Sequence, residues 1–183
     1  LKQQYISRGK YAVKITTTTT PMERNRVAIN FNVDEGKTAK IRKINIVGNK
    51  AFKEKDLLTA FVLRTPGLLT WFTKEDQYSK QKLGADLESL RSYYLNRGYL
   101  EFSIDSTQVS ITPDMQDIYI TVNISEGEQY SVSEIKLAGE LLVPEEELRK
   151  LIKIAPGQVF AREKLTESVK LITDRRGLRR PRG

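Results

Sequence analysis

The sequence predicts an α+β protein built from tandem copies of one unit, with elements in the order β-α-α-β-β. Three observations predict this class. Several short segments alternate apolar and polar residues, as half-buried strands do, and one long segment carries apolar residues at helical spacing. The third is a repeat: residues 32–48, NVDEGKTAKIRKINIVG, align without a gap with residues 123–139, NISEGEQYSVSEIKLAG. Repeats of about 80–90 residues are small domains strung in a row.

The unit begins with a strand that we expect over residues 40–47, and its copy is expected over 131–138. Gly48 and Gly139 follow these two strands and mark turns. Both copies are therefore expected to open with the same strand and turn.

Two helices are expected next, a short one over about 53–61 and a longer one over about 78–97. The longer helix has an amphipathic stripe at spacings of four, three and four, formed by Leu83, Leu87, Leu90 and Tyr94. Gly98 is expected to end this helix in the left-handed conformation.

The last two strands are expected over residues 100–111 and 118–124, separated by a polar turn. Apolar residues alternate cleanly in 118–124, and the segment 26–33 is its earlier copy. Together with the first strand and the two helices, these strands complete the order β-α-α-β-β.

Only the middle copy, about 37–128, is complete by this pattern. Residues 1–36 correspond to the C-terminal half of a preceding copy, and residues 129–183 to the N-terminal part of a following one. Neither half can close its own sheet core, so we expect each to need a docking partner or pairing between chains. The chain is expected to be part of a larger protein.

Composition narrows the function classes. The 183 residues include no Cys and no His, which removes thiolate nucleophiles, the commonest zinc ligands and the commonest general base. The net charge is +8. Half of that excess lies in residues 173–183, which carry five Arg against one Asp. We therefore expect no cofactor or metal, no enzymatic activity and no nucleic-acid partner.

The segment 99–114, YLEFSIDSTQVSITPD, changes the parity of its apolar residues. The first three lie at even positions and the last two, Val109 and Ile111, at odd ones. Since successive strand side chains point to opposite faces, a flat strand would turn the last two outward. We therefore predict a β-bulge, which adds one residue, within Asp105–Gln108.

Two interpretations of this bulge stay open. In the first, it returns Val109 and Ile111 to the core. In the second, it leaves them exposed as an apolar contact patch on an edge strand, where unpaired backbone groups can receive an extended chain by β-augmentation.

The segment 67–76, GLLTWFTKED, places Leu68, Leu69, Trp71 and Phe72 between the two helices. These side chains could form an exposed anchor, because Trp is frequent in interface hot spots. We expect instead that they fold back beneath the loop as a satellite of the core.

Three motifs carry a resemblance to a known family: INIVGNKAF at 44–52, LRSYYLNRGYLEFSIDSTQVSITPD at 90–114 and VNISEGEQY at 122–130. With the tandem β-α-α-β-β order, they resemble the POTRA domains of the Omp85 family of outer-membrane assembly factors. The resemblance implies two helices on a three-stranded mixed sheet. It also implies that the three segments belong to a second, third and fourth POTRA domain.

The resemblance implies a periplasmic scaffold of the β-barrel assembly machinery, at the periplasmic face of the Gram-negative outer membrane. The partners it implies are a BamB-like propeller lipoprotein, other lipoproteins of the assembly complex and unfolded outer-membrane proteins. A C-terminal β-barrel of the parent protein, absent from this sequence, is implied as well. The family uses no cofactor and is not enzymatic.

The resemblance also implies site residues, because a bulged second strand in the third POTRA domain docks the propeller lipoprotein. The matching positions are Asp105, Val109 and Ile111, and we include Thr107 and Gln108 beside them.

The alternative to a scaffold is a basic, KH-like nucleic-acid-binding module, since the KH domain shares the element order. That domain grips the backbone with a GXXG loop between two helices. Here TPGLLTWF occupies that place, without the second glycine or a basic cluster, so the alternative rests on the arginine-rich tail alone.

Overall fold

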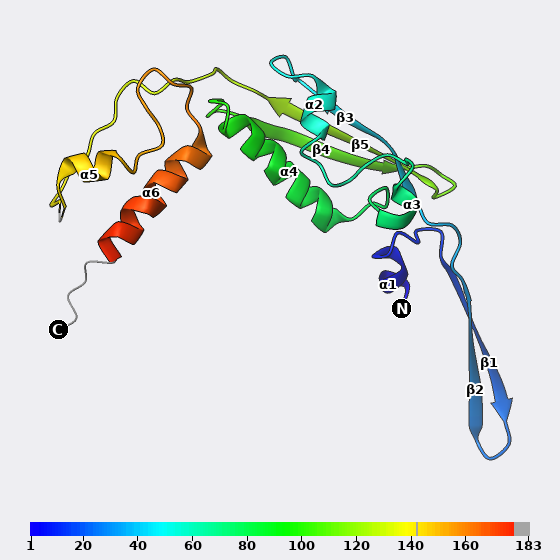
Figure 1. Ribbon diagram of the computed structural model, residues 1–183. Coiled ribbons are helices and arrows are strands. Elements are labelled where there is room, and N and C mark those ends of the chain that lie inside the picture. Colours follow the sequence, from blue (N-terminus) through cyan, green and yellow to red (C-terminus); the bar gives the residue numbers. More distant parts are fainter. Residues whose placement is uncertain (142, 178–183) are drawn as a thin grey trace, which may run out of the picture.

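The computed structural model describes residues 1–141 and 143–177, which form a complete middle unit flanked by two smaller segments (Figure 1). The first segment contains α1 (Lys2–Ile6), β1 (Lys14–Met22) and β2 (Arg26–Asp34). The middle unit contains β3 (Lys40–Val47), α2 (Glu54–Leu58), α3 (Thr70–Thr73), α4 (Lys80–Leu95), β4 (Ser103–Ile111) and β5 (Asp117–Ser125). The last segment contains α5 (Glu145–Arg149) and α6 (Arg162–Gly177).

The middle unit is an α+β fold with a three-stranded mixed sheet, as the sequence predicts. The strand order is β3-β5-β4, with β3 parallel and β4 antiparallel to the central β5. The expected strand over 40–47 is confirmed, and the short helix α3 is an addition that the periodicity did not indicate.

The core lies between one face of this sheet and the helices α2 and α4. Alternation on β5 buries its apolar residues almost completely, and the stripe of α4 covers them. Tyr94 of α4 stacks on Phe102, with ring centroids 4.3 Å apart. The remaining buried members of the cluster include Ile41, Ile44, Ile46, Leu57, Phe61, Leu63, Leu83 and Leu90. Helices therefore cover one face of the sheet, as the alternation requires.

The turn after β3 is tied to the end of β5. Gly48 has φ +101°, and a Cβ there would lie 2.2 Å from the carbonyl oxygen of Ile124. Glu126, just beyond β5, accepts hydrogen bonds from the backbone N–H groups of Lys50 (2.5 Å) and Ala51 (3.1 Å). A glycine and a carboxylate together hold the turn against the central strand.

The two flanking segments do not build comparable cores. The hairpin β1–β2 is a two-stranded sheet whose side chains are almost all exposed. The strand expected over 131–138 does not form, and only an isolated bridge joins Ser131 to Val159. That expectation was wrong because a strand needs a partner along its whole length, and residues 157–160 pair with this segment only at residues 130–132.

The expectation for the loop between the helices was also wrong. Leu68, Leu69 and Phe72 are exposed, whereas Thr70 is the buried residue. Thr70 donates a side-chain hydrogen bond to the carbonyl of Gly67 and accepts one from its N–H, both at 2.9 Å, so the loop closes on itself. The Trp71 side chain lies outside the described residues.

The buried Asp86 of α4 is hydrogen-bonded to the backbone of the segment that follows α2. Its carboxylate accepts hydrogen bonds from the backbone N–H groups of Val62 (2.8 Å) and Leu63 (2.9 Å). A buried N–H without a partner is costly, so this side chain is expected to stabilise the unit.

Replacing Asp86 with Ala should lower the free energy of unfolding of the middle unit by about 2–4 kcal/mol, because one buried and one partly buried N–H group lose their acceptor. Urea unfolding followed by far-UV circular dichroism measures this loss. Glu88→Ala on the same helix removes the same charge from an exposed residue that pairs with Arg91, and should cost less than about 0.5 kcal/mol. Equal losses for the two variants would contradict the assignment.

Candidate functional site

Strand β4 is the more open edge of the sheet. The other edge strand, β3, is partly covered where the Ile41 N–H donates to the carbonyl of Asp76 at 2.7 Å. Within the described part of the chain, nothing pairs with the outer edge of β4. An edge with free N–H and C=O groups is a template for another strand.

The bulge that the parity of the sequence predicts is confirmed in β4. Ile104 lies opposite Ile124, but the next pair is Ser106 with Asn123, so Asp105 is the extra residue. Beyond it Val109 lies opposite Ile120, which is fully buried. The bulge therefore turns the second half of β4 so that its apolar residues face the helix-covered side.

Asp105 holds the bulge through two hydroxyl groups, one from each strand. Its carboxylate accepts hydrogen bonds from the hydroxyls of Ser125 (2.6 Å) and Ser103 (2.8 Å). These bonds, that of Ser125 foremost, hold the pKa of Asp105 below its ordinary value of 3.8. Next to it, the Asn123 amide donates to the hydroxyl of Ser106 at 2.9 Å and links the strands again.

The five residues predicted for the site all fall within β4, but they are not equally exposed. Ile111 and Thr107 are half-buried, and Ile111 packs against the core. Val109 faces the same side yet remains 40% exposed, and Gln108 is exposed on the opposite face. Each interpretation of the bulge is thus met in part, since it completes the core at Ile111 and leaves an apolar edge at Val109.

Two antiparallel strand pairs form in the described part of the chain, β1–β2 and β4–β5, and only the second contains a bulge. Its counterpart in the first segment, β1, pairs with β2 from Lys14↔Asp34 to Met22↔Arg26 without a register shift. A hairpin of this kind therefore forms without the extra residue. Hairpin formation alone does not explain why β4 has a bulge.

Sequence reasoning missed a cluster of contacts at the end of α4. The Arg97 guanidinium lies 3.5 Å from the ring centroid of Tyr93 and donates to the Tyr93 carbonyl at 2.9 Å. Asn96 accepts a hydrogen bond at 2.9 Å from the N–H of Glu163, at the start of α6. The sequence marks this place only by the adjacent residues Arg97 and Gly98, at the expected end of the helix.

Two other site classes find no support in the part of the chain that the structure describes. No group of three or more His, Cys, Asp or Glu side chains there could hold a metal ion. Among those same residues, no helix combines the length and apolar character needed to span a bilayer.

One complete α+β unit with an open, bulged sheet edge, flanked by parts of two further copies, defines a protein of the tandem-repeat α+β class. The sequence matches the model of the POTRA family, described as "Surface antigen variable number repeat", over residues 39–127 and 130–177. The chain belongs to the POTRA family.

Relatives over most of the chain are outer membrane protein assembly factors named BamA. The protein of Neisseria meningitidis serogroup B is 34% identical over 97% of this chain, and that of Buchnera aphidicola is 30% identical over 94%. The chain spans 22% of the first relative's length and 28% of the second's.

A solved structure has the same fold. The crystal structure of POTRA domains 3–5 of BamA from Haemophilus influenzae superimposes with a TM-score of 0.56 at 18% identity. The match covers 95% of this chain and 65% of that one.

Replacing Ser125 with Ala should raise the pKa of Asp105 towards its ordinary value, because the carboxylate loses its strongest hydrogen bond. A pKa that is lower in the folded state stabilises the bulge above the unfolded-state pKa. That stabilisation is lost as the pH falls through the folded-state pKa. The carboxyl ¹³C shift of Asp105, followed against pH, measures the change. Ser110→Ala on the same strand is the control, and an unchanged titration in the Ser125 variant would refute the assignment.

Proposed function

We propose that this chain is a periplasmic POTRA scaffold of the β-barrel assembly machinery, which docks partners by strand addition along β4. The observation that carries the proposal is the open outer edge of β4 beside a bulge that leaves Val109 40% exposed. The relatives named as outer membrane protein assembly factors support the setting, at the periplasmic face of the outer membrane.

The chemistry of the edge favours strand addition. Residues 106–111, STQVSI, contain no charged residue and no proline, the usual devices that protect an edge strand from pairing. An incoming strand would bond to the backbone of β4 and set alternate side chains beside Val109. Backbone pairing depends little on sequence, which suits a receiver of many different substrates.

The partners we propose are a BamB-like propeller lipoprotein, other lipoproteins of the complex and unfolded outer-membrane proteins. The contact residues are Asp105, Thr107, Gln108, Val109 and Ile111. On the same basis, residues 1–36, 37–128 and 129–183 are parts of a second, third and fourth POTRA domain, in a parent protein with a C-terminal β-barrel.

Amide NMR of the full chain, titrated first with a BamB-like propeller lipoprotein and then with an extended strand peptide from an outer-membrane barrel, tests the proposal. We expect shift changes concentrated in β4, with Val109→Asp weakening binding about tenfold or more, because a carboxylate would be desolvated at the contact.

The matched control is Val47→Asp on β3, an edge-strand valine that is 51% exposed. It introduces the same charge and should leave binding unchanged. Shift changes that avoid β4 with both ligands, or equal losses in the two variants, would overturn docking at this strand.

A further inference from the structure

The two edges of the three-stranded sheet differ in how far they are protected. Residues 106–111 of β4 carry no charge and no proline, and nothing in the described part of the chain pairs with their outer side. On β3, by contrast, two backbone N–H groups are bonded to acceptors outside the sheet. We infer that Glu54 closes β3 to strand addition and so directs an incoming strand to β4, an inference that rests on the docking proposed for β4.

The first half of β3 is closed by the backbone of the chain itself. The Ile41 N–H donates to the carbonyl of Asp76 at 2.7 Å, and Lys40 forms an antiparallel bridge with Gln77. Residues 76–77 therefore take the place that an added strand would occupy at this end of β3.

The second half of β3 is closed by a side chain instead. The Ile46 N–H donates to the carboxylate of Glu54 at 3.0 Å, in a partly buried position. Glu54 is the first residue of α2, and the turn that leads to it is held by the Asn49 amide, which donates to the carbonyl of Phe52 at 2.9 Å. An added strand would have to offer a carbonyl to the same N–H, so the carboxylate competes with it directly.

Both bonded N–H groups lie on the outer edge of β3. Successive residues of a strand direct their backbone groups to opposite edges, so Ile41 and Ile46, at positions of different parity, would not share an edge in a regular strand. The register shift between Ile41 and Lys43 removes this difference. Ile44, two residues before Ile46, therefore directs its backbone groups to the outer edge as well.

Room for a strand exists beside Ile44. An open cavity of about 470 Å³ borders this residue, and Glu54 lines the same cavity together with Leu58, Leu63 and Pro66. Crowding therefore does not protect this part of the edge, which leaves the hydrogen bond of Glu54 as its protection.

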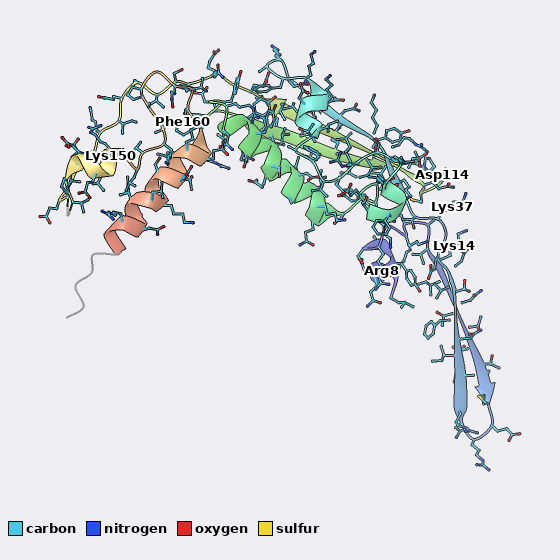
Figure 2. All side chains as sticks on the ribbon, in the orientation of Figure 1. Arg8, Lys14, Lys37, Asp114, Lys150 and Phe160 are labelled. Carbon is cyan, nitrogen blue, oxygen red and sulfur yellow. The ribbon has the colours of Figure 1, made fainter. Side chains whose placement is uncertain are left out.

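Charge does not protect the second half of β3 either. The three cationic residues of the strand all lie in its first half: Lys40, Arg42 and Lys43. In Figure 2, Lys37 and Asp114 add further charge at the end of the sheet where β3 begins. Residues 44–47, INIV, are uncharged, and Val47 is 51% exposed. An uncharged, apolar edge pairs with other strands unless something covers it, and here Glu54 does.

A strand peptide from an outer-membrane barrel, titrated into the full chain and followed by amide NMR, tests the inference. The native chain should bind one peptide, with shift changes in β4 and none in residues 44–47. Glu54→Ala frees the Ile46 N–H, so this variant should bind a second peptide and add shift changes in residues 44–47. Isothermal titration calorimetry gives the number of peptides bound per chain.

Three further variants separate the hydrogen bond from charge and from folding. Glu54→Gln keeps an oxygen that accepts from the Ile46 N–H, and should behave like the native chain. Asp56→Ala removes the same charge from an exposed residue of α2, and should do so too. Glu54→Ser keeps a polar residue at the start of α2 but is too short to reach Ile46, so it should open the edge as Glu54→Ala does.

Hydrogen exchange measures the closure without any ligand. Protection of the Ile46 amide should fall about tenfold or more in Glu54→Ala and Glu54→Ser, and stay unchanged in Glu54→Gln and Asp56→Ala. Amides of the central strand β5 should keep their protection in all four variants, which would show that the fold is intact.

Different outcomes would overturn the role of Glu54 and the docking at β4. Shift changes in residues 44–47 of the native chain, or Glu54→Ala and Glu54→Ser variants that bind at β4 alone, would overturn the role of Glu54 and leave the docking standing. A native chain that binds no peptide at β4, together with variants that bind at β3, would overturn the docking and keep the role of Glu54. Binding at neither edge in any of these chains would overturn both.

Discussion

The central position of β5 is the constraint on which the rest of the middle unit depends. It is paired on both edges, and its alternating apolar residues are buried against α2 and α4. The tight turn at Gly48 leaves room for the carbonyl of Ile124 in β5. Glu126, just beyond the end of β5, accepts a hydrogen bond from the same turn. In the flanking segments this arrangement is incomplete: β2 is paired on one edge only and keeps its apolar side chains exposed, and residues 132–138 form no strand.

The units are joined by one repeated hydrogen bond. At the first junction the Ala39 N–H donates to the carbonyl of Gly9 at 2.9 Å, and at the second the Tyr130 N–H donates to that of Gly98 at 2.8 Å. Both glycines have positive φ, as helix-ending glycines do. A Cβ at Gly98 would also lie 2.7 Å from the Tyr130 carbonyl oxygen. The same residue therefore ends a helix and receives the linker of the next unit, which couples the unit to its neighbour.

Periodicity and internal repetition were enough to predict the element order and the strands of the middle unit, because these follow from local alternation. The parity change also located the bulge within Asp105–Gln108, and the structure narrows it to Asp105. β3 has the same change of parity, with Ile41 at an odd position and Ile44 and Ile46 at even ones. The structure has a register shift between Ile41 and Lys43, which the sequence analysis did not predict. The exposed loop and the missing strand at 131–138 could not be predicted, since both depend on what lies opposite the segment. For the same reason, the partial exposure of Val109 needed the structure.

Core packing and an open edge are not competing roles for the bulge. Without the extra residue, Val109 and Ile111 would point to the uncovered face of the sheet, and the helix side of the edge would be polar. With it, Ile111 joins the core and Val109 lies at the rim of the helix layer, incompletely covered. A bulge can also protect an edge by twisting it away, and charged side chains and proline are other means of protection. Here the one carboxylate, Asp105, is engaged by two hydroxyl groups within the sheet, so it fixes the bulge rather than guarding the six uncharged residues beyond it.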